Sequence, residues 1–286
     1  MRSRDATYPR VRRSNPSMLN LFRKRVIPEP AAPRTVPAGR RVYAIGDVHG
    51  RLDLLDDLIA RIERDDAARP SAHTDWVLLG DLVDRGPDSA GVIDRVIRLS
   101  NEYPNVRLLI GNHEEVFLGA LDGDPESLKL FTRIGGRETI LSYGIGEDDY
   151  DRLDWDTLSA RIRAAVPDHH VAFLRQAEDV IEIGDYAFVH AGIRPGVSLA
   201  DQRATDLRWI RDRFLGHEDD FGKMIVHGHT ITDEPQELPN RIGIDTGAFE
   251  SGRLTALGLE GKSRWFLATE GMAIVDDREG GRAAQP

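Results

Sequence analysis

The sequence contains no cysteine among its 286 residues. This absence excludes disulfides, thiolate metal sites and a cysteine nucleophile, so oxygen atoms and imidazole nitrogens remain as candidate metal ligands. The chain also lacks an apolar run approaching the ~20 residues that a transmembrane helix needs. It has no apolar segment followed by a small-residue cleavage site, which is the pattern of a secretory signal. We therefore expect a cytoplasmic protein.

Charge is distributed unevenly along the chain, whose formal net charge is −10. Residues 1–41 hold eleven Lys or Arg and two Asp or Glu, so the remainder is more acidic than the whole. We expect an acidic domain of this kind not to bind nucleic acid. Residues 1–40 are rich in Arg and Pro with little periodicity, which predicts a disordered basic tail. We interpret the tail as a solvated leader. The alternative is that Met18–Arg25 contacts a partner or an anionic surface.

Three short apolar segments each run into a loop that contains glycine and polar residues. They are Val42–Ile45 before GDVHG, Trp76–Leu79 before GDLVDRG, and Val106–Ile110 before GNHEE. Apolar residues recur at helical spacing after the first two loops, over 52–62 and 92–99. This βαβαβ pattern predicts parallel strands whose following loops lie at one edge of one sheet, where ligands bind in α/β proteins.

Beyond residue 113 the pattern becomes more helical and then returns to strands. We expect helices over 114–121, 125–143 and 153–176, with an acidic loop at 144–151. The segments 180–183 and 186–189 predict a hairpin. Further strands are expected at 224–226, 241–244, 254–259 and 263–267, as a second, largely antiparallel sheet. The folded domain is placed at 41–270, with a flexible C-terminal tail at 271–286.

Histidine accounts for nine residues, and four of them follow apolar strands directly. These four are His49, His113, His190 and His229. Interleaved with Asp and Asn in glycine-rich turns, they predict ligands for divalent ions such as Mn, Fe, Zn or Ni. Two ions explain the number of ligands better than one, since a shared carboxylate holds two ions ~3.5–4 Å apart. The remaining histidines at 73, 169, 170 and 217 are interpreted as structural.

Five motifs then carry a resemblance to a known family. GDVHG, GDLVDRG, GNHE, VHAG, and GHT followed by IDTGA resemble the calcineurin-like metallophosphoesterases, over residues 42 to about 260. The likeness is to the phosphoprotein-phosphatase branch, and within it to the bacterial and bacteriophage lambda-type serine/threonine phosphatases. The resemblance implies the metallo-dependent phosphatase fold, which is an α+β, four-layer α-β-β-α sandwich of two packed mixed sheets. We expect a helical insert at about 115–178.

The resemblance also implies roles for residues of this sequence. Asp47 and His49 would bind a first ion, Asp81 would bridge, and a second ion would lie on Asn112, His190 and His229. Mn²⁺ is expected for both ions, with Fe, Zn and Ni as alternatives. His113, oriented by Asp84, would protonate the leaving oxygen, and Arg85 and Arg211 would hold phosphate. Arg208 and Arg213 are alternatives to Arg211, and His227 and Asp245 are expected to be supporting residues.

The motif GHTI places Ile231 where many other branches of the superfamily have a further histidine ligand. This favours the phosphoprotein-phosphatase branch. The principal hypothesis is therefore a two-metal phosphomonoesterase for phosphoserine, phosphothreonine and small phosphate monoesters, in which a metal-bridging hydroxide attacks phosphorus directly.

The alternative hypothesis is a dinucleoside-polyphosphate hydrolase of the diadenosine tetraphosphatase type, because GDLVxRGPxS is shared. The motif GNHE rather than GNHD favours the phosphatase. A non-catalytic scaffold is a remote third reading, since every ligand position is filled. The segments 115–178 and 194–222 are expected to form the walls that select the substrate.

Overall fold

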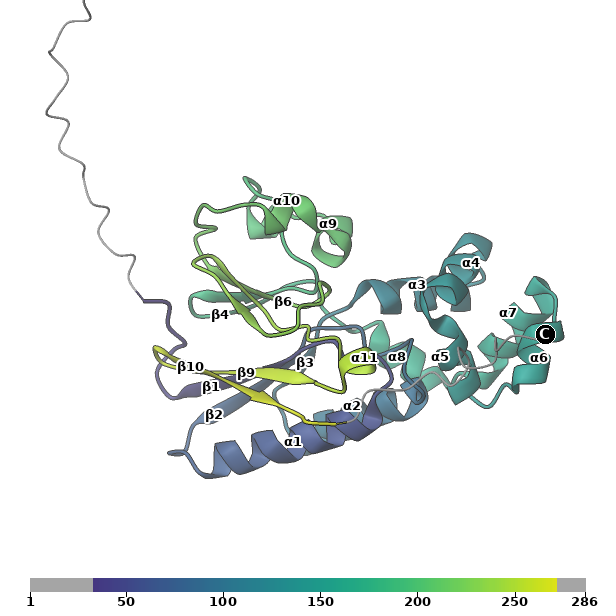
Figure 1. Cartoon of the computed structure of the whole chain (residues 1–286), viewed down its shortest axis with the longest axis horizontal. Coiled ribbons are helices and arrows are strands. Elements are labelled where there is room, and N and C mark those ends of the chain that lie inside the picture. The colour runs from purple at the N-terminus through teal and green to yellow at the C-terminus, as the bar shows by residue number, and fades with distance from the viewer. Residues whose placement is uncertain (1–32, 272–286) are drawn as a thin grey trace, which may run out of the picture. The chain divides into compact units, whose positions relative to one another are not determined.

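The computed structural model describes residues 33–271, which contain two five-stranded sheets (Figure 1). The first sheet has the order β10-β9-β1-β2-β3. Its strands β1, β2 and β3 are parallel, as the βαβαβ pattern predicts, and β9 pairs antiparallel with β1. The strands are β1 (Arg40–Ile45), β2 (His73–Leu78), β3 (Val106–Leu108), β9 (Thr255–Glu260) and β10 (Ser263–Ala268).

The second sheet has the order β4-β5-β6-β8-β7. Its hairpin β4-β5 is antiparallel as predicted, but β5-β6 and β6-β8 are parallel. The expectation of a largely antiparallel second sheet is therefore wrong, and the two last strands that it included, β9 and β10, belong to the first sheet. Its strands are β4 (Ile181–Ile183), β5 (Tyr186–Phe188), β6 (Met224–His227), β7 (Gln236–Glu237) and β8 (Arg241–Gly243).

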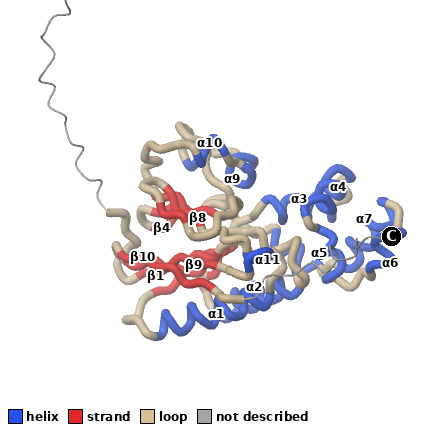
Figure 2. Tube along the Cα trace, in the orientation of Figure 1, coloured by secondary structure: helices blue, strands red, loops and turns tan. Residues whose placement is uncertain are grey.

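The two sheets face each other across an apolar core and carry helices on their outer faces (Figure 2). Alternation along β1 shows this: Val42 and Ala44 join the core between the sheets, whereas Tyr43 and Ile45 pack in the cluster under α1 and α2. A third cluster, which includes Ile225, lies on the outer face of the second sheet. The predicted α-β-β-α sandwich of two mixed sheets is confirmed.

Helices α1 (Leu52–Ala67) and α2 (Ser89–Glu102) are the two crossovers of the βαβαβ unit. The predicted helix over 125–143 is broken at Gly135, and the one over 153–176 is broken at Val166, which is extended before Pro167. The acidic segment 144–151, which was expected to be a loop, contains most of helix α6 (Glu147–Arg152). The insert contains α3 (Asn112–Leu121), α4 (Pro125–Ile134), α5 (Gly136–Ser142), α6 (Glu147–Arg152), α7 (Trp155–Ala165) and α8 (Asp168–Leu174).

Besides α6, four further short helices were not predicted. They are η1 (Leu199–Asp201), α9 (Ala204–Trp209), α10 (Asp212–Leu215) and α11 (Ala248–Ser251). Within residues 33–271, no helix combines the length and the apolarity that a membrane span requires.

The described fold starts earlier than the predicted domain boundary. Arg34 forms an ion pair with Asp220 at 2.5 Å, and Thr35 donates to Asp185 through its backbone N–H and its hydroxyl. Val36 is buried between the sheets. These residues belong to the predicted 1–40 tail and yet pack on the domain. Residues 1–32, with the candidate contact segment at 18–25, and residues 272–286 lie outside the described part.

Candidate active site

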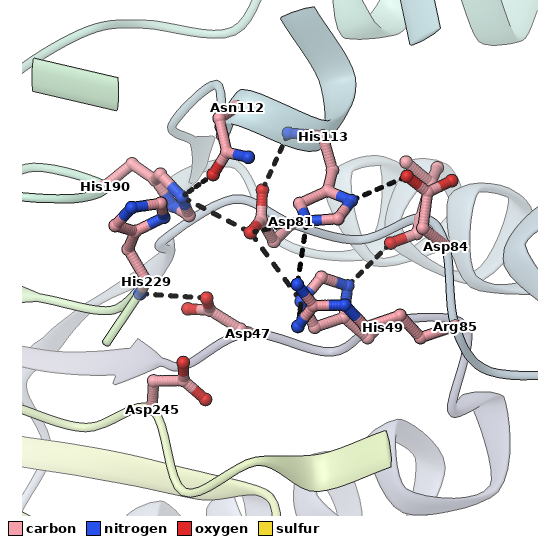
Figure 3. A network of polar contacts seen from close by, with 12 residues as sticks. Asp47, His49, Asp81, Asp84, Arg85, Asn112, His113, His190, His229 and Asp245 are labelled. Carbon is pink, nitrogen blue, oxygen red and sulfur yellow. Dashed lines mark hydrogen bonds and ion pairs between the residues drawn. The ribbon is translucent and has the colours of Figure 1, made fainter. Parts of the chain in front are cut away.

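The polar loops that follow β1, β2, β3, β5 and β6 meet at one edge of the two sheets (Figure 3). Asp81, from the loop after β2, lies at their centre and is 2 % exposed. Its Oδ2 atom lies 3.4 Å from His190 Nε2, 3.7 Å from His49 Nε2 and 3.9 Å from His113 Nε2. Residues that follow strands of both sheets are thus brought around one carboxylate.

Two groups of metal-type donors share this carboxylate. The first is His49, Asp81 and His113, and the second is Asp81, His190 and His229; within each group the donor atoms lie within 4.8 Å of one another. All five residues are buried. Asn112 extends the second group, because its Oδ1 atom lies 3.1 Å from His190 Nε2. A pair of overlapping groups is the arrangement that two adjacent ions require.

Asp47 lies beside the second group. Its Oδ2 atom accepts a hydrogen bond from the backbone N–H of His229 at 2.9 Å, whereas its buried Oδ1 atom has no hydrogen-bond partner among the described residues. A Cβ atom at Gly228 would lie 1.9 Å from this oxygen, so only glycine fits there. An unpaired buried acceptor costs about 1–3 kcal/mol, and a cation at this position would offset that cost.

Hydrogen bonds fix which nitrogen of two histidines faces the site. The Nδ1 atoms of His49 and His190 donate to the carbonyl oxygens of Val83 and Leu79, each at 2.8 Å. A carbonyl only accepts, so Nδ1 carries a proton and Nε2 is the nitrogen that faces Asp81. The donor set of imidazole, carboxylate and amide therefore fits divalent ions such as Mn²⁺ or Zn²⁺.

The ionisation of this cluster follows from burial and mutual charge. Burial raises the pKa of Asp81, but the charges of His190 and His113 outweigh it and hold the pKa well below the ordinary value. Burial lowers the pKa of His190, but the charge of Asp81 outweighs it and raises the pKa to about 10. A metal ion binds only the neutral imidazole, so binding at this site displaces a proton from His190.

His113 and Asp84 form a second element of the site. The Nδ1 atom of His113 donates to Asp84 Oδ2 at 2.6 Å, and Thr139 Oγ1 donates to Asp84 Oδ1 at 2.7 Å. Burial lowers the pKa of His113, but the charge of Asp81 and the hydrogen bond with Asp84 together raise the pKa. The ring is thereby oriented with Nε2 toward the pocket and favours the protonated form.

Two arginines reach the same pocket. Arg85 Nη1 lies 3.0 Å from His49 Nε2 and Arg85 Nη2 lies 3.1 Å from His113 Nε2, and Arg211 donates through Nε to His229 Nε2 at 3.1 Å. Among the alternatives, Arg208 is paired with Asp179 and Glu115. Arg211, but neither Arg208 nor Arg213, lines the pocket. The pocket has a volume of about 210 Å³ and is lined by Asp81, Arg85, Asn112, His113, Ile134, Trp209, Arg211 and His229.

Backbone strain is concentrated at this site. In the described part of the chain, every non-glycine residue with positive φ belongs to the loops of the site. Such conformations cost about 1–3 kcal/mol each and are kept where the surroundings enforce them. They are His49 (φ 46°), Asp81 (φ 49°), Asp84 (φ 74°), Arg85 (φ 70°) and His229 (φ 61°).

Glu114 is the residue that the sequence interpretation missed. Its fully buried carboxylate accepts hydrogen bonds from the backbone N–H groups of Gly111, Asp81 and Leu82 at 2.9, 2.8 and 2.7 Å, and from Val83 at 3.3 Å. It thereby joins the loop after β2 to the start of α3. The sequence signal was partial: Glu114 is the third residue of α3 and accepts from the backbone N–H of the N-cap residue, but that residue is Gly111, which has no side chain to complete a capping box.

The supporting residues are placed as expected near the site. His227 is buried against the ring of Phe214, with ring centroids 5.0 Å apart, and burial lowers its pKa to about 4. Asp245 accepts a hydrogen bond from the backbone N–H of Gly247 at 2.9 Å, and burial raises its pKa to about 6. Neither residue belongs to the two donor groups.

Comparison with known proteins finds bis(5'-nucleosyl)-tetraphosphatases among the relatives of this chain. The chain is 28% identical over 233 residues to bis(5'-nucleosyl)-tetraphosphatase PrpE [asymmetrical] of Anoxybacillus flavithermus, covering 74% of this chain and 88% of that protein. It is 33% identical over 157 residues to bis(5'-nucleosyl)-tetraphosphatase, symmetrical, of Acidovorax sp. strain JS42, covering 54% of this chain and 44% of that protein.

Solved structures show the same fold. One is a candidate diadenosine tetraphosphatase, with a TM-score of 0.57, 20% identity, and coverage of 83% of this chain and 98% of that one. Another is a cold-active protein-tyrosine phosphatase of a psychrophilic Shewanella, with a TM-score of 0.50, 18% identity, and coverage of 82% and 83%. The family model described as calcineurin-like phosphoesterase matches residues 40–250, which span the loops described above. The chain therefore belongs to the calcineurin-like phosphoesterase family.

Proposed function

We propose that this protein is a metal-dependent hydrolase of dinucleoside tetraphosphates. The observation that carries the proposal is the pair of donor groups sharing Asp81, with Arg85 and Arg211 beside the same pocket. Cations and guanidinium groups converging on one cavity suit a polyanionic substrate that is cleaved at phosphorus. Family membership supports phosphoester chemistry in general.

The residues present would hold two divalent ions, for which we propose Mn²⁺. Asp47 and His49 would bind one, Asn112, His190 and His229 the other, and Asp81 both. When bound, such a pair of ions neutralises phosphoryl oxygens and lowers the pKa of water to supply the nucleophile. The Nε2 atoms that His49 and His190 turn toward Asp81, and the unpaired Oδ1 of Asp47, support metal-ligand roles for these residues.

The side chains of the chain itself supply binding and proton transfer. Arg85 and Arg211 would form charge-assisted hydrogen bonds with phosphate oxygens. His113 would donate the Nε2 proton to the leaving oxygen, because its Nδ1 proton is committed to Asp84. Asp84 would act by orienting and charging the imidazole, and Thr139 holds Asp84 in turn.

The choice of substrate class departs from the principal sequence hypothesis. The motif comparison favoured phosphoserine and phosphothreonine, with dinucleoside polyphosphates as the alternative. The relatives that match three quarters of the chain are named as tetraphosphatases, which supports the alternative better. The protein-tyrosine phosphatase neighbour shares 18% identity and supports the fold alone.

The test compares both substrate classes on one preparation. Purified protein in Mn²⁺ is given diadenosine tetraphosphate and a phosphoserine peptide in parallel, and the products are separated by chromatography. We expect a higher kcat/KM for the tetraphosphate and loss of activity on chelation. The products also locate the cut, since two ADP indicate symmetrical cleavage and ATP with AMP indicates asymmetrical cleavage. Faster hydrolysis of the peptide would contradict the proposal.

A matched pair of variants tests the phosphate contact. Arg211→Ala removes a guanidinium that lines the pocket, and we expect KM for diadenosine tetraphosphate to rise about 10-fold or more, as for a lost charge-assisted hydrogen bond. Arg213→Ala removes an exposed arginine two residues away that does not line the pocket. Equal effects of both variants would show that Arg211 acts only through general surface charge.

A further inference from the structure

A third group of metal-type donors lies outside the candidate active site. It consists of Asp94 on α2 and of His169 and His170 at the start of α8, whose donor atoms lie within 4.8 Å of one another. His170 Nε2 lies 2.9 Å from Asp94 Oδ1, and His169 Nε2 lies 3.6 Å from the same oxygen. None of the three lines the active-site pocket. The sequence interpretation read both histidines as structural.

The spacing of these atoms suits a tetrahedral ion. Bonds of about 2.0–2.1 Å to imidazole nitrogen and carboxylate oxygen place neighbouring ligand atoms about 3.3 Å apart. The two distances from Asp94 Oδ1, 2.9 and 3.6 Å, lie on either side of that value. The rings of His169 and His170 stand edge to face with centroids 4.5 Å apart. Both imidazoles therefore approach the carboxylate oxygen from different directions.

The surroundings of this group hold His170 in place and leave His169 and Asp94 open to solvent. His170 is 2 % exposed, and its Nδ1 atom lies 2.9 Å from the hydroxyl of Tyr143. A metal-binding histidine commonly forms a hydrogen bond through its other ring nitrogen, which fixes the ring. The side chains of His169 and Asp94 are 63 % and 57 % exposed, so an ion can reach them from solution and keep water in a remaining position.

We propose that Asp94, His169 and His170 form a separate surface site for a zinc-type divalent cation. Two imidazoles and one carboxylate without thiolate suit Zn²⁺ or Ni²⁺ better than Mg²⁺ or Ca²⁺, which prefer sites made of oxygen ligands. The site goes beyond the proposed hydrolase function and does not depend on it. An ion there joins α8 to α2 directly, in place of the hydrogen bond between Asp94 and His170.

The position of this site also connects it to the catalytic acid. Tyr143, which contacts His170, caps the end of α5, and Thr139 lies one turn earlier on the same helix. Thr139 donates to Asp84, the partner of His113. An ion that fixes His170 therefore stabilises the helix that holds Asp84. We expect zinc to stabilise this part of the insert against unfolding.

The test counts zinc ions bound by the full chain. Chelated protein is titrated with Zn²⁺ against a competing chromophoric chelator, for wild type, His169→Ala, Asp94→Asn and His73→Ala. His169 is exposed, so its loss leaves the core intact, and His73 is an exposed histidine outside all three donor groups. We expect wild type and His73→Ala to bind one more equivalent than His169→Ala and Asp94→Asn, or to bind it at least 10-fold more tightly.

An Asp81→Asn background separates this equivalent from those of the candidate active site, because Asp81 belongs to both groups there. In that background we expect Zn²⁺ to raise the melting temperature further when His169 is present than when it is alanine. Equal zinc stoichiometry and affinity with and without His169 would overturn the proposal, whatever the catalytic activity of the protein.

Discussion

Asp81 combines several properties that rarely occur together in one side chain. It is buried, its backbone is in the left-handed region at φ 49°, and its carboxylate belongs to both donor groups of the site. Three imidazole nitrogens lie within 3.9 Å of its Oδ2 atom. Its negative charge raises the pKa values of His190 and His113, and its removal should affect both groups at once.

Asp81→Asn is therefore expected to abolish tight binding of both Mn²⁺ equivalents and to remove hydrolysis. The neutral amide attracts the cations less, and its NH₂ group presents donors where ligands are required. Elemental analysis after dialysis against Mn²⁺ measures the loss. Asp245→Asn, a buried aspartate outside both groups, is the control and should retain at least one equivalent. Two tightly bound ions in Asp81→Asn would exclude the shared role.

The role proposed for His113 can be separated from a ligand role by the choice of leaving group. A serine alkoxide leaves only when protonated, whereas nitrophenolate departs readily as an anion. We expect His113→Asn to lower turnover of a phosphoserine substrate by ~10²–10⁴-fold and that of p-nitrophenyl phosphate by less. Asp84→Asn should show a milder form of the same difference, because Asp84 is proposed to act only by orienting and charging the ring.

Metal content is the control for this pair of variants. It should be unchanged if His113 transfers a proton, since the Asp81 carboxylate and the other histidines remain. Equal losses on both substrates, accompanied by lost metal, would assign His113 as a ligand of the first donor group instead, with His49 and Asp81.

Glu114 supports the site by accepting hydrogen bonds from backbone N–H groups, and no contact with substrate is proposed for it. Glu114→Gln puts an NH₂ group opposite two of the four backbone N–H donors, so we expect the free energy of unfolding to fall by about 2 kcal/mol or more. Urea denaturation measures this loss. Glu126→Gln on the exposed start of α4 is the control and should change it by less than about 0.5 kcal/mol. Equal stability of both variants would refute this role of the carboxylate.

At the scale of elements, the junction between α4 and α5 positions Arg85, the arginine proposed to bind phosphate. Gly135 separates the two helices at φ 120°, and its carbonyl oxygen accepts a hydrogen bond from the backbone N–H of Arg85 at 3.0 Å. The next helix presents Thr139 to Asp84. A break that local helical periodicity did not predict therefore serves two residues of the site.

Gly135→Ala would place a Cβ atom 2.7 Å from Arg85 Cγ and 3.0 Å from its backbone nitrogen. We expect the arginine to shift and KM for the phosphate substrate to rise several-fold. Gly144→Ala is the matched control, because Gly144 also has positive φ, 83°, but no atom lies within 4 Å of its added Cβ. Both variants incur backbone strain, so only the difference in KM between them reports on Arg85.

Helix α6 shows why part of the insert was not predicted. Its acidic residues Glu147, Asp148 and Asp149 indicated a loop by composition, but they occupy the first helical turn, where negative charge complements the helix dipole. The break at Val166 could have been read from Pro167, which disfavours a helical residue before it. The helical spacing of apolar residues over 153–176 indicated one continuous helix, and this prediction did not take the proline into account.

At the scale of the molecule, the sequence predicted the parts of the fold that local patterns encode. The strands β1 and β2, the hairpin β4-β5 and the loops that bear Asp47, Asp81 and Asn112 follow from apolar runs and glycine-rich turns. The sequence did not predict to which sheet β9 belongs, because β9 pairs with β1 through residues that are distant in sequence, such as Val42 and Leu259. Glu114 was missed for a related reason: its contacts with Asp81 and Leu82 cross between loops.

The start of the folded domain gives the last prediction. Arg34, Thr35 and Val36 contact Asp220, Asp185 and the core between the sheets, although composition assigned them to a disordered tail. Two truncated proteins, beginning at residue 34 and at residue 38, differ by these contacts and by Pro37. Burial of one Val side chain contributes about 1.5–3 kcal/mol, and for a domain of this size each kcal/mol corresponds to about 2–4 °C. We expect the shorter protein to melt about 3–12 °C lower in a calorimetric scan. Equal melting temperatures would show that the fold does not need these residues and would move the boundary back to β1.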